Sequence, residues 1–321
     1  MRSSAKFLTV VVAIGLLSAV VAAAQPTSSP ADPATRSAAT VEMVGKVYPR
    51  LSSGALAAAK LGLLADGAVL KAGDLTIKAT DLDDQIGKAP EAVREQLKKN
   101  AFFVLEQMAT GKLLLAEAKA AMSKDGKDVA ELSDRELMDG LSTKLTADIK
   151  VTDQEVADFY AKNKDMVGGQ PLESVKDAIG KHLLQQKQQE LINRHIGTLG
   201  QRTAIEVSAS WAKQQEALAR DNPVDKARDS GRPSLVDFGA KGCIPCDKLA
   251  PILEAMKTKY EGKANVLFVS VREQQILASR YGIQSIPVQV FFDKDGNETF
   301  RHTGFWPQEE LEKKLAELGA K

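Results

Sequence analysis

Cysteine, histidine and excess charge are what this chain has least of. Its 321 residues include 2 cysteines and 3 histidines, and 43 Lys and Arg against 42 Asp and Glu leave a net charge of +1. A chain so nearly neutral has no broad positive field, so we expect neither a nucleic-acid partner nor an acidic membrane surface as a partner. A structural zinc site needs a full tetrahedral set of ligands, which the cysteines with His182, His195 and His302 do not supply at any usual spacing. We therefore also expect no metal ion.

Long apolar runs are missing beyond the N-terminus. There, Arg2 and Lys6 precede an apolar run over residues 7–21, and alanines follow at residues 22–24. This is the layout of a secretory signal peptide over residues 1–24, and its apolar core is shorter than the about 18 residues of a membrane span. We expect cleavage, export to the periplasm and no stable membrane span afterwards, with retention as an uncleaved anchor as the alternative. Disulfide chemistry is permitted in that compartment.

The rest of the chain divides into parts of different character. Its length predicts roughly two domains, at about 100–200 residues each. Residues 25–43 are rich in Pro, Ser, Thr and Ala without periodicity, which predicts a disordered leader. Residues 44–208 predict a mostly α-helical domain with one hairpin over residues 69–77. Residues 209–232 predict a helix that breaks into a linker, and residues 233–321 alternate strands with helices, which predicts an α/β domain with a central sheet.

Capping boxes mark two helix starts in the helical part. Ser133 with Glu136, and Thr152 with Glu155, have the spacing at which a hydroxyl and a carboxylate satisfy backbone donors of the first turn. An Ala-rich apolar pattern within residues 44–64 predicts a further short helix.

A long helix is predicted after Pro171. Its middle, residues 185–190, is almost wholly polar, so we expect this helix to project into solvent or to meet a partner. His182 and His195 lie on its polar face, and we expect them to be solvated and to carry no chemistry.

The two cysteines form the pair Cys243-Ile244-Pro245-Cys246 directly after an apolar strand. A strand followed by CxxC is the arrangement of a thiol–disulfide exchange site. If a helix begins at Cys243, its free N–H groups and positive dipole end stabilise the thiolate, so Cys243 is the expected attacking nucleophile. Cys246, about one turn on and more buried, resolves the mixed disulfide. The alternative is a purely structural disulfide, which closes too short a loop to stabilise the fold much. We expect no cofactor besides this redox-active disulfide.

Residues flanking the cysteines resemble thioredoxin over residues 234–321. The strand that contains Asp237 matches the first core strand of that family, and the resemblance implies that Asp237 shuttles the proton of Cys246. Ile286 and Pro287, after Ser285, resemble the family's cis-proline loop. There the residue before the proline pairs with the substrate backbone, so the resemblance implies that Ile286 and Pro287 bind substrate.

The sequence departs from that family's pattern at several places. Gly242 stands where members usually have Trp, Gly239 replaces an aromatic residue, and Phe268 occupies the strand position that often holds a Lys near the buried Asp. Ile244 and Pro245 replace the usual Gly-Pro. Because that dipeptide tunes the redox potential, the direction of electron flow stays open.

The helical part carries a second resemblance. The hairpin, the stretch of residues 151–164 (VTDQEVADFYAKNK) and the stretch of residues 182–190 (HLLQQKQQE) resemble the N-terminal chaperone domain of SurA-type periplasmic peptidyl-prolyl isomerases, over about residues 66–208. That family commonly inserts a parvulin isomerase domain after the first stretch, and here only residues 165–171 intervene. The resemblance therefore implies binding of unfolded exported polypeptides, and no proline isomerisation.

Taken together, these patterns predict an exported thiol–disulfide oxidoreductase. Its expected clients are unfolded or cysteine-containing exported proteins, held by the chaperone-like domain and kept near the CxxC pair by a linker. An unidentified redox partner would reset the cysteines. One alternative is a periplasmic holdase chaperone whose thioredoxin fold is a docking module without redox turnover. Another makes the helical domain an oligomerisation device.

Overall fold

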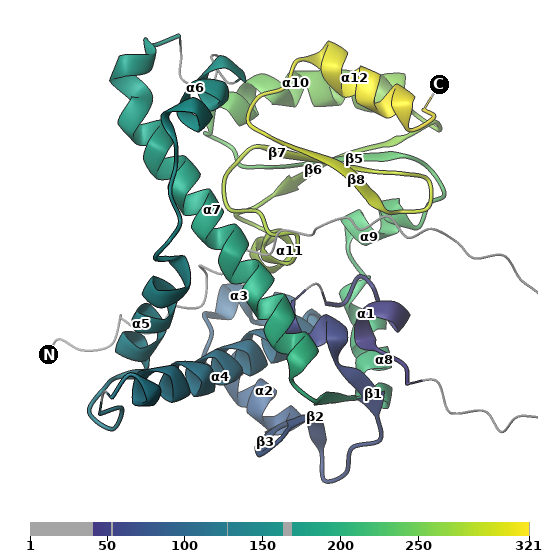
Figure 1. The fold of residues 1–321 in the computed structure, drawn as a ribbon. Coiled ribbons are helices and arrows are strands. Elements are labelled where there is room, and N and C mark those ends of the chain that lie inside the picture. The colour runs from purple at the N-terminus through teal and green to yellow at the C-terminus, as the bar shows by residue number, and fades with distance from the viewer. Residues whose placement is uncertain (1–40, 53, 127, 163–168, 321) are drawn as a thin grey trace, which may run out of the picture.

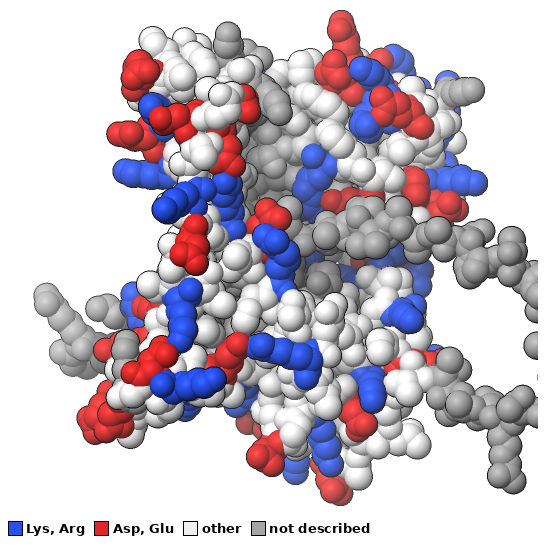
Figure 2. Space-filling model, in the orientation of Figure 1, with Lys and Arg blue, Asp and Glu red and all other residues white. Residues whose placement is uncertain are grey.

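The computed structural model shows two layered units stacked one on the other (Figure 1). It describes residues 41–52, 54–126, 128–162 and 169–320. The expected signal peptide lies outside these residues, as does most of the expected leader. The expected order, a helix-rich region followed by an α/β domain, is confirmed. Within the described ranges, no helix combines the length and the apolar character that crossing a membrane requires. Charges of both signs are interspersed on the face drawn in Figure 2.

The N-terminal unit, which ends at Ser208, contains a small mixed sheet besides its helices. The expected hairpin is confirmed as β2 (Ala68–Ala72) and β3 (Leu75–Lys78). Among the described residues this sheet has the strand order β1-β4-β2-β3. β4 (Ile205–Ser208) pairs in parallel with β1 (Lys60–Gly62) and antiparallel with β2. The sequence did not predict β1 or β4.

The helix expected within residues 44–64 is wrong for most of that range. The segment forms only α1 (Val44–Val47), the 3-10 helix η1 (Ala55–Ala58) and then β1. The physical cause is a buried carboxylate: Oε1 of Glu106 accepts hydrogen bonds from the backbone N–H of Gly54 at 3.2 Å and of Leu56 at 3.1 Å. These amides bond to a side chain instead of continuing a helix.

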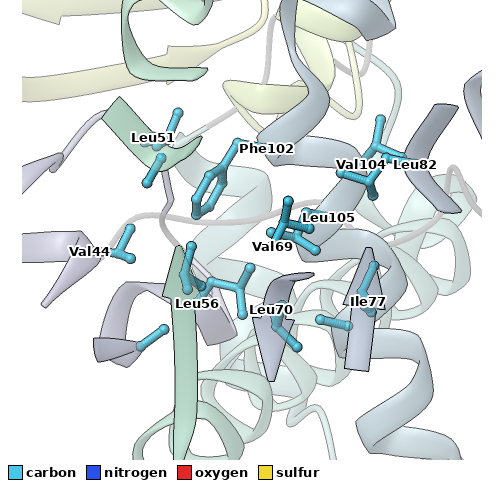
Figure 3. Close-up of a cluster of buried hydrophobic side chains, with 14 of the residues drawn as sticks. Val44, Leu51, Leu56, Val69, Leu70, Ile77, Leu82, Phe102, Val104 and Leu105 are labelled. Carbon is cyan, nitrogen blue, oxygen red and sulfur yellow. The ribbon is translucent and has the colours of Figure 1, made fainter. Parts of the chain in front are cut away.

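The helices of this unit are α2 (Ala79–Gly87), α3 (Glu91–Lys99), α4 (Ala101–Lys124), α5 (Asp134–Thr146), α6 (Asp153–Lys162) and α7 (Leu172–Arg202). Both capping boxes are confirmed at the starts of α5 and α6: the Ser133 backbone N–H donates to Glu136 at 2.8 Å, and that of Thr152 donates to Glu155 at 2.9 Å. Phe102 and Leu105 of α4 face Leu70 of the hairpin in the buried core (Figure 3).

α7 runs from the N-terminal unit up beside the C-terminal unit (Figure 1). Its lower half packs against η1, where a methyl group added at Gly200 would overlap the carbonyl oxygen of Ala55. Its upper half packs against α6. The expectation of solvated histidines is wrong for His195, whose Nε2 lies 2.8 Å from Oε2 of Glu117. His182 is exposed as expected, with its ring 5.5 Å from that of Phe159.

The C-terminal unit, from Pro223 to Ala320, is a sheet between two helical layers. Within the described chain its strands are β5 (Ser234–Gly239), β6 (Asn265–Ser270), β7 (Val288–Phe292) and β8 (Glu298–Thr303), in the order β6-β5-β7-β8. α10 (Ile244–Lys259) and α12 (Gln308–Glu317) bury their apolar sides on one face, and α9 (Pro223–Arg228) and α11 (Gln275–Arg280) on the other. The expected alternation of strands and helices around a central sheet is confirmed.

The segment expected to break into a linker is folded as α8 (Ala209–Ala219) and α9. Asp225 of α9 is fully buried, and charged groups of both units surround it. Gln96 of α3 also donates from Nε2 to the carbonyl of Glu273, at 2.7 Å. The two units therefore meet through direct polar contacts rather than through a flexible tether.

Candidate functional site

The two cysteines lie where β5 ends and α10 begins, and they form a disulfide with a Cα–Cα distance of 5.2 Å. Cys243 is the N-cap of α10, and Pro245 occupies the first turn, where its missing N–H leaves no helical hydrogen bond unmade. Cys246 is buried at 4% exposure, whereas Cys243 is half-buried and Ile244 is 73% exposed. The sulfur of Cys243 is thus the more accessible one, at the end of the helix that favours a thiolate.

The loop before β7 lies directly against Cys243. The Ile286–Pro287 peptide bond is cis, and Sγ of Cys243 lies 4.0 Å from the carbonyl oxygen of Ile286. The backbone N–H of Gly304 donates to the carbonyl of Pro287 at 2.8 Å, which holds this loop against the end of β8. The structure therefore brings together the cysteines and the loop that the sequence singled out.

Asp237 lies in the middle of β5 and is fully buried. Its Oδ1 accepts a hydrogen bond from Nε2 of Gln289 at 2.8 Å, whereas its Oδ2 has no hydrogen-bond partner among the described residues. Burial raises the pKa of Asp237 from 3.8 to about 6, and the hydrogen bond from Gln289 partly opposes that rise. A carboxyl group with such a pKa can exchange a proton near neutral pH.

The backbone of Gly239 marks the point where these groups meet. A Cβ atom built there would lie 3.2 Å from Oδ2 of Asp237, 3.5 Å from Cβ of Cys246 and 2.9 Å from the ring of Phe268. Glycine at this position therefore leaves room between the carboxylate and the second cysteine. The Phe268 ring occupies part of the room that a larger residue at 239 would need.

Gln289 is the residue that reading the sequence missed. It is fully buried in β7 and pairs across the strands with Asp237. The available signal was one polar residue inside the apolar run Val288-Gln289-Val290-Phe291-Phe292, directly after the proline loop. Its partner, however, depends on the register between β5 and β7, which no local pattern gives.

The disulfide has an apolar rim. Among the described residues of the C-terminal unit, the exposed large apolar side chains are Ile244, Phe268 and Phe305. Ile244 follows Cys243, Phe268 borders Gly239, and Phe305 follows Gly304 of the proline-loop contact. Exposed apolar side chains beside a reactive disulfide are suited to binding a polypeptide. Within the described ranges, no cluster of three or more His, Cys, Asp or Glu side chains is arranged to hold a metal ion.

Comparison with known proteins places the site in a family context. Residues 221–319 match the model of a thioredoxin-like domain. Thioredoxin of Staphylococcus aureus is 42% identical over 91 residues, which are 28% of this chain and 86% of that protein. Among solved structures, Fasciola hepatica thioredoxin is 30% identical with a TM-score of 0.26, and the match covers 29% of this chain and 85% of the Fasciola protein. A thioredoxin from Nicotiana alata is 29% identical with a TM-score of 0.27, and the match covers 29% of this chain and 79% of the Nicotiana protein.

Proposed function

Because the chain belongs to the thioredoxin family through residues 221–319, we propose that it is an exported thiol–disulfide oxidoreductase that acts on cysteines of client polypeptides. The observation that carries this proposal is the disulfide between Cys243 and Cys246 at the N-terminus of α10, with the buried Asp237 behind it. The homology supports thiol–disulfide exchange in general terms. The clients and the compartment are what we add.

The exchange has two steps. In the reducing direction, the Cys243 thiolate attacks a client disulfide, forms a mixed disulfide and releases one client thiolate. Cys246 then loses its proton and attacks Sγ of Cys243, which breaks the bond to the client and releases the second client thiolate. The client gains two electrons and the CxxC pair loses them, as its disulfide re-forms. The same steps reversed oxidise a client dithiol.

Named residues have distinct roles in this proposal. Cys243 attacks because it is accessible and its thiolate is stabilised by the helix end. Asp237 takes the proton of Cys246, and Ile286 and Pro287 bind the client backbone beside Cys243. Ile244 and Pro245 tune the redox potential. No cofactor besides the disulfide is required.

We assign the N-terminal unit to client binding. The support is the resemblance of residues 66–208 to SurA-type chaperone domains, together with apolar side chains that α7 leaves half-buried, among them Leu183, Leu184 and Leu191. An apolar, incompletely covered helix face suits unfolded polypeptides. We further propose export directed by residues 1–24 and an as yet unidentified partner that resets the cysteines.

Single-cysteine variants test the activity. Cys243→Ser should abolish insulin reduction and the oxidation of a reduced client, whereas Cys246→Ser should accumulate mixed disulfides through Cys243. Unchanged exchange in Cys243→Ser would refute the proposal. Absence of exchange in the parent, with aggregation suppressed equally by the parent and a double Cys→Ser variant, would favour the holdase alternative.

The equilibrium reduction potential against glutathione decides the direction. A value near about −270 mV indicates a reductase, and a value near about −120 mV indicates an oxidant. Gel shift of alkylated protein across a series of glutathione buffers measures it directly.

A further inference from the structure

Asp237 and Gln289 form a buried polar pair under the helix that carries the cysteines. They face each other on β5 and β7, both have no exposed surface, and Nε2 of Gln289 lies 2.8 Å from Oδ1 of Asp237. Leu235 and Phe291, two residues from each along their strands, lie in the core that packs against α10. Because side chains two apart on a strand share a face, the pair lies on the α10 side of the sheet.

The hydrogen bond leaves one carboxylate oxygen free. Oδ2 of Asp237 has no hydrogen-bond partner within the described part of the chain, and it borders the space beside Gly239. Cβ of Cys246 borders the same space. With Oδ1 held by Gln289, the oxygen that remains unbonded borders the same space as the resolving cysteine.

The surroundings of this carboxyl group contain little other charge. β6 contributes Phe268 opposite Asp237, and α10 contributes Cys246. On β8, His302 pairs with Gln289, and burial lowers its pKa, so it is neutral at neutral pH. Lys241 and Asp247 beside the cysteines are exposed to solvent.

Burial and the Gln289 bond are the two influences on the pKa of Asp237, and they oppose each other. Among the described residues, Gln289 is the hydrogen-bond donor to this carboxylate. No ion pair of the described chain involves Asp237, so the amide has no charged competitor there.

We propose that Gln289 is a positioning residue for the resolving step: its amide holds Asp237 so that the free carboxylate oxygen faces Cys246 and stays ionised until it takes up that thiol's proton. The inference rests on the proposed exchange activity. It adds to that activity a residue that acts through Asp237 rather than on the client.

The proton balance of the step is simple. The S–H bond of Cys246 breaks and an O–H bond forms at Oδ2 of Asp237. The resulting thiolate attacks Sγ of Cys243, the bond from Cys243 to the client sulfur breaks, and the client leaves as a thiolate that takes a proton from water. Asp237 then returns its proton to solvent.

An amide is suited to this position because it has both a donor and an acceptor. It can donate to the carboxylate, and its carbonyl can accept from the carboxylic acid. Hydrogen bonds to the ionised form are the stronger ones. Removing the amide should therefore shift the balance toward the protonated acid.

The test follows the resolving step across pH. An aromatic disulfide reagent that releases a coloured thiol forms a mixed disulfide on reduced Cys243, and a second burst of colour reports resolution by Cys246. In Gln289→Leu the midpoint of the second burst should move up by about one pH unit, a tenfold change in proton affinity. The first burst should keep the pH dependence of the parent. A second-burst profile that superimposes on the parent's overturns the proposal.

Two further variants separate positioning from packing. In an Asp237→Asn background, Gln289→Leu should leave the midpoint unmoved, and an equal shift there would overturn the proposal. Gln289→Glu keeps the shape but sets two carboxyl groups side by side, which cannot both ionise, so its midpoint should also move up. If the second burst of Gln289→Glu has the same pH midpoint as that of the parent, the inference is contradicted, even if Gln289→Leu does not fold.

A second measurement distinguishes this inference from the proposed function. Carbon-13 NMR of the Asp237 carboxyl group follows its titration without any turnover. A parent that gives no second burst refutes the exchange activity. A titration midpoint of Asp237 that is equal in the parent and in Gln289→Leu refutes the role of Gln289, whatever the activity.

Discussion

Arg280 of α11 and Asp225 of α9 lie 3.6 Å apart, from Nη2 to Oδ2, in the contact between the two units. Asp225 is fully buried, and Nη1 of Arg50, from the N-terminal unit, lies 4.0 Å from its Oδ1. Arg280 also donates from Nη1 to Oδ1 of Asn100 on the N-terminal unit, at 3.0 Å. One buried carboxylate thus contacts cationic side chains of both units. This contact fixes the position of the C-terminal unit, with its exchange site, relative to the N-terminal unit.

Asp225→Ala should destabilise the whole chain. It leaves Arg50, Arg228 and Arg280 without their shared buried anion, and breaking a buried ion pair costs about 3–5 kcal/mol. Urea unfolding followed by circular dichroism measures the loss. Asp221→Ala is the matched control, since its partners Lys99 and Lys226 are exposed, and it should change stability little. Equal effects of the two variants would contradict the assignment.

The stability of the oxidised chain should depend on pH through Asp237. The unfolded chain releases this proton near pH 4, whereas the folded chain keeps it until about pH 6, because burial raises the pKa of Asp237. The folded chain thus binds more protons in that window, and its stability falls as pH rises through it.

Asp237→Asn removes the free-energy cost of ionising this buried carboxyl group. The variant should match the parent below about pH 4 and exceed it by about 2–3 kcal/mol above about pH 6. Urea unfolding at a series of pH values measures the difference. Asp295→Asn, at an exposed aspartate, is the control for removal of a surface charge. A gain for Asp237→Asn that is the same at both ends of the pH range would rule out titration of this carboxyl group as its source.

Two glycines of α7 should respond in opposite directions to alanine. Gly200→Ala places a methyl group on the carbonyl oxygen of Ala55, a rigid backbone atom, so we expect a loss of about 1–3 kcal/mol. Gly197→Ala meets nothing within 4 Å, and should gain up to about 1 kcal/mol from helix propensity. Thermal unfolding of both variants tests this, and a gain for Gly200→Ala would contradict the close packing of α7 on η1.

A cation opposite Asp237 should lower its pKa. Phe268 is the cross-strand partner of Asp237 and is half exposed, so Phe268→Lys can place an ammonium group near the carboxylate. An opposite charge favours the ionised acid, which should bring the pKa of Asp237 below about 6. Phe268→Met is the uncharged control. Carboxyl NMR titration compares them, and identical midpoints would show that position 268 does not reach Asp237.

Local patterns were sufficient for the C-terminal unit but not for the N-terminal sheet. β5 and β7 are short apolar runs between turn signals, and the cysteines follow the first of them, so strand and site are predictable together. β1 and β4 are only 3 and 4 residues long, and their pairing joins the start of the N-terminal unit to its end. No periodicity develops over such lengths.

Contacts that depend on tertiary structure could not be predicted from the sequence either. Asp237 could be singled out as a lone carboxylate in an apolar strand, but its partner Gln289 depends on strand register. Asp225 is one of many charged residues in the segment expected to be a linker, and its burial depends on the packing of α9 between the units.

The position of β4 has a consequence for synthesis. β4 lies between β1 and β2, although it is made after α7, so an inner strand of this four-stranded sheet is the last of its strands to leave the ribosome. Closing so long a loop is entropically costly and slows folding. A chain that stopped at Arg202 would keep α7 and yet leave β1 without its neighbouring strand. The sheet of the N-terminal unit can therefore be completed only in a chain that extends past α7 to β4.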